Sequence, residues 1–278
     1  TQKNLYSISL DGQNKKKLSP IQGNDDADFN TTFTYYIHTY TNANRPPFTA
    51  LRRSADGAEV RTLEDNNGLL RKFNDYTLTT KEFFKFKTSD GTELNGWMMK
   101  PFLSDVEPAI ISGGKKYPAL MLVYGGPGSN TVNDMWDRDY MWYQMLCAKG
   151  YIIVSVDNRG TGGRGKKFRD CTYKQLGKLE TEDQIEAAKY LGTLPYIDKT
   201  RIGIWGWSYG GYMSSLCIMK GAEYATPSHP SPKGKELSVQ PSPFGGDGGG
   251  VGVGIFKMAM AVAPVTNWRY YDNIYTER

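Results

Sequence analysis

The sequence has few of the residues that build disulfide scaffolds, metal centres or membrane spans. Its 278 residues include only three cysteines and two histidines. Cys147, Cys171 and Cys217 are odd in number and lack metal-ligand spacing, which argues against a disulfide scaffold and against a zinc site. No apolar run approaches the roughly 20 residues that a membrane-spanning helix needs. We therefore expect a soluble globular chain that holds no metal ion.

The sequence also lacks long runs of residues that carry charge of one sign. The chain carries 34 Lys and Arg residues against 29 Asp and Glu residues, a net charge of +5. The densest basic cluster, residues 15–17, lies beside a turn and is typical of a solvated loop. Because basic residues are spread along the chain, we expect no nucleic-acid-binding face. The length suggests about two domains, since one domain takes roughly 150 residues.

The first part of the chain predicts short β-strands joined by tight turns. Residues 5–10 alternate in polarity before Asp11-Gly12, and residues 33–40 are rich in aromatic residues and threonine. A second turn signal follows at Asp56-Gly57. Hairpins at this spacing are typical of a β-propeller or a β-sandwich. Residues 1–80 are too few to close a propeller, so we expect one blade and part of another.

From about residue 81 the pattern changes to an alternation of strands and helices. Thr181 to Gln184 has the form of a capping box, which predicts a helix that begins there and ends at Gly192. Strands are predicted at residues 83–87, 94–99, 117–124, 151–156, 201–205 and 258–262. The last four are nearly continuous apolar runs, which are typical of a parallel sheet covered on both faces. The predicted fold class is therefore α/β.

Residues 222–254 break this alternation. Proline and glycine supply 13 of these 33 residues. Such a composition cannot bury enough apolar surface to offset the entropy lost when the chain is ordered. We interpret the segment as a flexible insertion, or as an artefact of the gene record, and not as an element of the fold.

The most informative motif is Gly206-Trp207-Ser208-Tyr209-Gly210-Gly211. It follows a predicted strand and opens a predicted helix, which is the setting of the G-x-S-x-G nucleophile elbow. The glycines allow a turn tight enough to expose the Ser208 hydroxyl. The N–H of Tyr209, at the start of the helix, would point to where an oxyanion forms. The alternative interpretation is a glycine-rich strand–helix turn with an idle serine.

Three other segments follow predicted strands. Tyr124-Gly125-Gly126-Pro127-Gly128 suits the loop that completes the oxyanion hole in α/β-hydrolases, or is a plain glycine–proline turn. Residues 262–278 gather valine and aromatic residues beyond a strand end, where α/β sheets bind ligands, or supply ordinary core aromatics. The glycine-rich residues 157–165 match neither a P-loop nor a dinucleotide fingerprint, so we expect no nucleotide cofactor.

A serine nucleophile needs a base, normally a histidine oriented by a carboxylate, and in this fold both follow the serine along the chain. After Ser208 the only histidine is His229, within the proline- and glycine-rich segment. That segment leaves the far end of the predicted helix, about 18 Å from the elbow for a rise of about 1.5 Å per residue. We therefore expect neither His229 nor His38, among the N-terminal strands, to act as the base.

On these residues, above all the elbow motif extended to Tyr212 and residues 262–278, the sequence resembles the dipeptidyl peptidase IV branch of the prolyl oligopeptidase family. The resemblance implies terminal β-propeller blades in residues 1–80. Residues 81–278 would then be an α/β-hydrolase catalytic domain, incomplete at its C-terminus and interrupted by the insertion.

The resemblance also implies a serine-type peptidase that releases N-terminal dipeptides with a penultimate Pro or Ala through an acyl-enzyme. Ser208 would be the nucleophile, and the Tyr124 hydroxyl would join the Tyr209 N–H in the oxyanion hole. A compact apolar pocket would take the proline ring, and an arginine would lie near the bound dipeptide. These residues would be Val262, Val265, Trp268, Tyr271 and Tyr275 for the pocket, and Arg278 for the arginine. No metal or organic cofactor is implied.

The sequence departs from the family pattern because the chain ends before the family's Asp and His. It also lacks the early propeller blades, whose paired Glu residues hold the substrate's α-ammonium. We therefore expect the chain to be inactive alone. An esterase or lipase on the same fold, or a non-catalytic interaction module, are the alternatives. The family further suggests an extracytoplasmic location, periplasmic or membrane-anchored, and a homodimer of the full-length protein.

Overall fold

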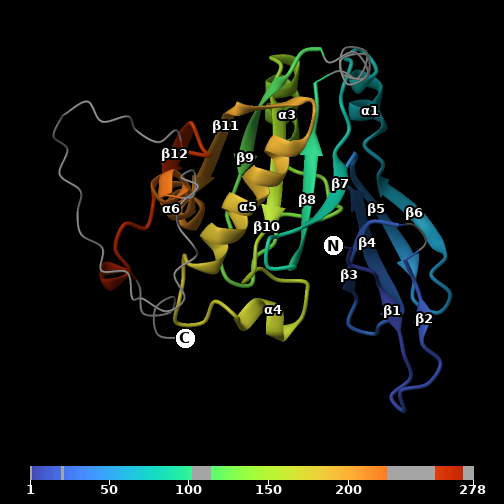
Figure 1. Ribbon diagram of the computed structural model, residues 1–278. Helices are drawn as coiled ribbons and strands as arrows, with labels where there is room; N and C mark the ends of the chain where they lie inside the picture. The colour runs from blue at the N-terminus through green and yellow to red at the C-terminus, as the bar shows by residue number, and fades with distance from the viewer. Residues whose placement is uncertain (1, 20–21, 102–113, 224–253, 272–278) are drawn as a thin grey trace, which may run out of the picture. The chain divides into compact units, whose positions relative to one another are not determined.

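The computed structural model describes residues 2–19, 22–101, 114–223 and 254–271 (Figure 1). The chain separates into two compact units, each made of three stretches of sequence. The first comprises Thr1–Lys85, Asn95–Lys115 and Asn130–Asp157, and the second comprises Phe86–Leu94, Lys116–Ser129 and Asn158–Arg278. The predicted domain limits, 1–80 and 81–278, stay a prediction.

The N-terminal part of the first unit is an antiparallel sheet of four strands in chain order. These strands are β3 (Asn24–Phe29), β4 (Tyr35–Asn42), β5 (Arg45–Arg53) and β6 (Glu59–Glu64), preceded by the short pair β1 (Tyr6–Ser7) and β2 (Lys16–Lys17). The predicted hairpins are confirmed. Strand β3 was missed because its sequence, NDDADF, is largely polar. The start of β5 was missed because two prolines, which argue against a strand, follow its first residue.

His38 lies in this sheet and is buried. Its Nε2 atom lies 2.7 Å from Oδ1 of Asp25 on the neighbouring strand β3. Both side chains are almost inaccessible to solvent, at 2% and 0% exposure. His38 is therefore a buried histidine of the sheet.

The rest of the first unit contains helices and buried strands. Helices α1 (Asn67–Phe73) and α3 (Tyr140–Ala148) lie here, with α3 packed against β10 (Ile152–Asp157). Strand β10 pairs antiparallel with β8 (Glu93–Met99), and all six residues of β10 are buried. Strand β7 (Glu82–Lys87) precedes β8 in the chain. The predicted strands at 83–87, 94–99 and 151–156 are confirmed within a residue at each end.

The second unit has the alternation of strands and helices that the sequence predicts. Three parallel strands, β9 (Tyr117–Leu122), β11 (Ile197–Trp207) and β12 (Met258–Val262), lie in the order β12-β11-β9. Helix α6 (Tyr209–Glu223) packs against β11 and β12, and α5 (Leu179–Thr193) packs against β11 and α6 (Figure 1). Two short elements, α4 (Lys166–Asp170) and the 3₁₀ helix η1 (Trp268–Tyr270), complete it. The α/β fold class is confirmed.

The capping box predicted at Thr181 is wrong. Helix α5 begins earlier, with Lys178 as its N-cap and no side-chain hydrogen bond at that cap. Thr181 already lies within the helix, and its hydroxyl donates to the Gly177 carbonyl at 2.6 Å. The helix ends at Thr193, one residue beyond the predicted Gly192.

The described residues contain neither a membrane-spanning helix nor a cluster of metal ligands. None of their helices combines the length and the hydropathy that a membrane crossing needs. Nor do three or more His, Cys, Asp or Glu side chains gather there as metal ligands would. Most of the predicted insertion, residues 224–253, lies outside the described residues.

The middle strand β11 provides a test of the core. Ile204 is fully buried at 0% exposure. Ile204→Ala should lower the free energy of unfolding by about 2–5 kcal/mol, because it removes buried methylene groups and leaves a cavity. The same substitution at Ile8, which is 57% exposed, should change it by less than about 0.5 kcal/mol. Urea unfolding measures both, and equal losses would contradict this packing.

Candidate functional site

The elbow, residues 206–211, joins β11 to α6. Strand β11 ends at Trp207 and α6 begins at Tyr209, so Ser208 alone connects them. The φ angle of Ser208 is +57°, a left-handed conformation that non-glycine residues adopt only under constraint. Its N–H donates to the Val262 carbonyl at 2.9 Å, and its carbonyl accepts from the Tyr212 N–H at 3.0 Å. The backbone thus holds a partly exposed serine at the strand end.

The elbow glycines are explained by close approach of the backbone. A Cβ atom at Gly206 or at Gly210 would overlap the Val123 carbonyl oxygen. At Gly211 it would lie 2.7 Å from the Val262 carbonyl oxygen. A side chain at any of the three positions would push the elbow away from the ends of β9 and β12. The G-x-S-x-G-G spacing therefore follows from the packing around Ser208.

Tyr209 connects the elbow to its surroundings. Its N–H is the first of α6, at the positive end of the helix dipole. Its side chain is buried at 1% exposure, and its hydroxyl donates to Oε1 of Glu180 at 2.7 Å. Its ring centroid lies 6.1 Å from that of Tyr124 and 5.6 Å from that of Trp268. The aromatic side chain of Tyr209 therefore lies between two of the predicted site residues.

The turn that follows β9 carries Tyr124 and is held by a residue that the sequence analysis did not single out. Asn158 is fully buried, and its Nδ2 atom donates to the Gly125 carbonyl at 3.0 Å. Gly125 has a φ of +74°, and a Cβ atom there would lie 2.7 Å from Oδ1 of Asn158. Asn158 therefore fixes the backbone next to Tyr124.

The glycine-rich residues 157–165 pack against the same turn. The Gly128 N–H donates to the Gly160 carbonyl, and the Gly162 N–H donates to the Ser129 carbonyl, both at 2.9 Å. A Cβ atom at Gly162 would overlap the Gly128 carbonyl oxygen. Contact between two backbones thus accounts for glycine at 162, and no phosphate is needed to explain it.

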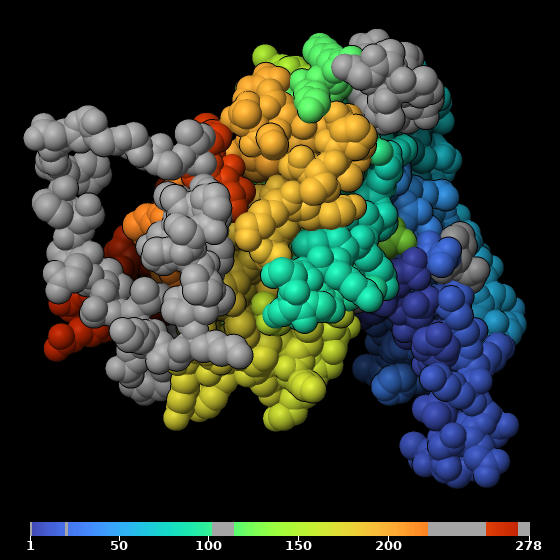
Figure 2. Space-filling model, in the orientation of Figure 1, coloured from blue at the N-terminus to red at the C-terminus, as the bar shows by residue number. Residues whose placement is uncertain are grey.

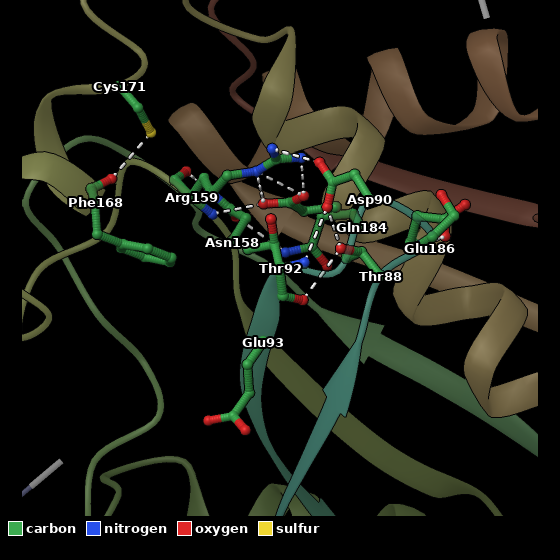
Figure 3. A network of polar contacts seen from close by, with 12 residues as sticks. Thr88, Asp90, Thr92, Glu93, Asn158, Arg159, Phe168, Cys171, Gln184 and Glu186 are labelled. Atoms are coloured by element: carbon green, nitrogen blue, oxygen red, sulfur yellow. Dashed lines mark hydrogen bonds and ion pairs between the residues drawn. The ribbon is translucent and has the colours of Figure 1, made fainter.

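An ion-pair network surrounds Asn158 (Figure 3). Arg159 places Nη2 at 2.6 Å from Oδ1 of Asp183 and Nη1 at 2.9 Å from Oδ2 of Asp90. Burial opposes the charged form of Arg159, but its bonds to Asp183 outweigh burial and raise the pKa of the guanidinium above its ordinary value. The backbone N–H of Arg159 also donates to Asp183, at 2.7 Å. The loop that carries Asn158 is therefore tied to α5.

Helix α5 buries polar side chains on the face that receives these contacts. Its fully or almost fully buried residues include Glu180, Thr181, Asp183 and Gln184. Burial raises the pKa of Glu180, although the hydrogen bond from Tyr209 opposes this effect. The opposite side of α5, drawn in orange in Figure 2, lies at the molecular surface. This role could not be predicted from the sequence, because Thr181 to Gln184 have the form of a helix cap.

The predicted pocket residues are described in part. Trp268 packs its ring against Tyr212 and Tyr271, with centroids 5.4 and 5.6 Å away, and Val265 is buried. Val262 ends β12 and accepts the Ser208 N–H through its carbonyl. Tyr275, Arg278 and His229 lie outside the described residues. The structure thus brings Trp268 next to the elbow, and the roles assigned to these residues stay predictions.

Comparisons with known proteins agree on one family. Residues 138–225 match the prolyl oligopeptidase family. The chain is 36% identical to a probable dipeptidyl-aminopeptidase B of Aspergillus niger, over 100% of the chain and 27% of that relative. It is 35% identical to another of that name in Arthroderma benhamiae, over 99% of the chain and 26% of that relative. The chain thus spans about a quarter of the length of these curated relatives.

Two solved structures show the same similarity. The dipeptidyl peptidase 4 of Porphyromonas gingivalis superposes with a TM-score of 0.82 and 40% identity, over 99% of this chain and 33% of that one. A putative dipeptidyl aminopeptidase IV from Bacteroides ovatus gives a TM-score of 0.65 and 30% identity, over 79% of this chain and 30% of that one.

The close approach at the elbow predicts the effect of adding one methyl group. Gly210→Ala should lower the free energy of unfolding by about 1–3 kcal/mol, because the Val123 carbonyl must move. Gly68 is the matched control, since it is also the second residue of a helix. A Cβ atom added there would lie 4.0 Å from the Arg71 guanidinium, which is ordinary contact. Gly68→Ala should be neutral or stabilising. Urea unfolding that shows no loss for Gly210→Ala would contradict the contact.

The buried carboxyl of Glu180 predicts a pH-dependent stability. Because its folded-state pKa lies above the ordinary value of 4.5, its ionisation costs stability as the pH rises from about 4.5 through the raised pKa. Glu180→Gln removes this cost but keeps an acceptor for Tyr209. The variant should therefore gain stability relative to the wild type between about pH 4.5 and about pH 8.

Glu182→Gln, the same change at a partly exposed position in the first turn of α5, is the control and should show no such gain in stability, because a carboxylate there is solvated and lies near the positive end of the helix dipole. Thermal unfolding at the two pH values measures both variants. A Glu180→Gln difference that does not grow with pH would refute the assignment.

Proposed function

Because the chain belongs to the prolyl oligopeptidase family and is similar to its dipeptidyl peptidases, we propose that it forms part of a serine peptidase. In this proposal the protein releases N-terminal dipeptides with a penultimate Pro or Ala. The observation that carries the proposal is Ser208 itself, held at a φ of +57° between a parallel strand and a helix. A strained backbone conformation at a partly exposed strand end supports a functional role for this serine.

The chemistry proposed at the elbow is acyl transfer. The Ser208 hydroxyl oxygen bonds to the carbonyl carbon of the penultimate residue and gives up its proton, and the carbonyl oxygen takes up the negative charge. The Tyr209 N–H and the Tyr124 hydroxyl stabilise this oxyanion. Collapse of the intermediate breaks the peptide bond, delivers the proton lost by Ser208 to the leaving nitrogen, releases the shortened peptide as an amine and leaves the dipeptide esterified to Ser208. Water then hydrolyses the ester. None of the described residues is assigned as the base.

The selectivity proposed for Pro or Ala rests on the aromatic side chains beside the elbow. Trp268 packs between Tyr209 and Tyr271, with centroids 5.6 Å away in both pairs. Flat aromatic walls suit a compact apolar ring, and a small pocket excludes longer side chains. An extracytoplasmic location and a homodimer are further proposals that rest on the family resemblance alone.

The proposal is tested on the complete product of the gene that contains this sequence. Hydrolysis of a Gly-Pro chromogenic substrate should exceed that of an acyl ester, and a fluorophosphonate probe should label Ser208. Ser208→Ala should abolish labelling and lower kcat by about 10⁴-fold or more, because it removes the nucleophile.

The control for this experiment is Ser215→Ala. Ser215 lies on the same helix and donates its hydroxyl to the Gly211 carbonyl at 3.0 Å. The variant should keep kcat within about threefold, since changes away from reacting groups cost little. Preference for the ester, or activity retained without Ser208, would refute the proposal.

A further inference from the structure

Helix α5 contains a conflict between sequence and burial. Four polar side chains in its first six residues are nearly inaccessible to solvent, although helices in α/β folds normally bury apolar faces. Burial of a carboxyl group is costly unless it gains specific partners. Positions that break local rules in this way are expected at functional sites. The partners of these side chains lead to the elbow and to the Tyr124 turn.

The first connection runs from Glu180 to the elbow. Oε1 of Glu180 accepts the Tyr209 hydroxyl at 2.7 Å, and both side chains are buried. The ring that this hydrogen bond orients belongs to the residue whose N–H begins α6. A fixed ring therefore also restricts the backbone of the first helical turn, beside Ser208.

The second connection runs from Gln184 to the Tyr124 turn. Its Nε2 atom donates to Oδ1 of Asn158 at 3.0 Å, and Nδ2 of Asn158 donates to the Gly125 carbonyl at 3.0 Å. Gln184 and Asn158 are both at 0% exposure, so water does not compete for these bonds. Gln184 follows Glu180 by four residues, which places the two side chains on the same face of the helix.

Asp183 supports the second connection. Oδ2 accepts the backbone N–H of Arg159 at 2.7 Å, and Oδ1 accepts its guanidinium Nη2 at 2.6 Å. Arg159 follows Asn158 directly, so this ion pair holds the loop that presents Asn158. Figure 3 shows Asn158, Arg159 and Gln184 meeting at this point.

We infer that α5 positions both donors of the proposed oxyanion hole, the Tyr209 amide through Glu180 and the Tyr124 turn through Gln184 and Asn158. The inference rests on the proposed function. The two donors come from loops that are far apart in the sequence, and an oxyanion hole works only when both are held to within about 0.5 Å. Because α5 is hydrogen-bonded to both loops, it can hold the two donors in a fixed position relative to each other. Glu180, Gln184 and Asn158 are positioning residues and touch no substrate in this arrangement.

The test uses conservative variants of the complete gene product. Tyr209→Phe deletes the hydroxyl but keeps the ring and the N–H, and Gln184→Met deletes the donor at similar volume. Each should lower kcat about tenfold, with KM within about twofold, because the donors act on the transition state. Fluorophosphonate labelling of Ser208 should slow by a similar factor. Glu180→Gln keeps an acceptor and should retain kcat within about threefold.

The control is Glu182→Gln, on the same helix but partly exposed, which should leave kcat and the labelling rate unchanged. If Gln184→Met is recovered only as unfolded protein, Asn158→Ala deletes the same connection and carries the same expectation. Folded Tyr209→Phe and folded Gln184→Met (or Asn158→Ala) could instead melt at a lower temperature while kcat stays unchanged. That result would mean a purely structural role and would overturn the inference.

The two proposals fail in different ways. Labelling of wild-type Ser208 without cleavage of Gly-Pro substrates would overturn the peptidase proposal, while the labelling rates of the variants would still decide the positioning role. Labelling at equal rates in the wild type and all variants would overturn the positioning role alone. Absence of any labelling in the wild type would overturn both.

Discussion

The Val123 carbonyl oxygen occupies the space that a side chain would need at Gly206 or Gly210. This contact is possible because β9 and β11 are parallel neighbours, and the Val123 N–H donates to the Trp205 carbonyl at 2.9 Å. Tyr124 follows Val123 directly, in the turn after β9, so the backbone approach that compresses the elbow also brings Tyr124 to it. The conformation of Ser208, the start of α6 and the place of Tyr124 therefore depend on one approach between two backbones.

Local signals identified the elbow and most of the strands, but not the connections between elements. The elbow could be predicted because its glycines, serine and flanking strand and helix lie within one short stretch. The parallel strands could be predicted because both faces are apolar. The Glu180–Tyr209 and Asn158–Gly125 bonds join residues 29 and 33 positions apart. A threonine followed three residues later by a glutamine suits a helix cap equally well, and only the folded chain distinguishes a cap from a buried polar face.

The polar face of α5 also shows what the site requires from the fold. A leucine-rich face would pack α5 against β11 and α6 without burying a carboxyl group or an ion pair. Apolar contacts, however, have no direction, whereas each hydrogen bond from Glu180, Asp183 and Gln184 specifies one partner atom. Helix α5 thus lacks the apolar contacts that a leucine-rich face would make, and its hydrogen bonds instead fix the orientation of two loops. This balance between stability and geometry is typical of functional sites.

The hydrogen bond from the Ser208 N–H to the Val262 carbonyl ties the elbow to a strand that follows much later in the chain. The elbow is therefore complete only after the chain has returned from α6 to form β12. The entropy of closing such a loop grows only with the logarithm of its length, at about 0.6 kcal/mol for each doubling. Evolution can accordingly lengthen the connection between α6 and β12 at little energetic cost, provided that β12 still reaches its place beside β11.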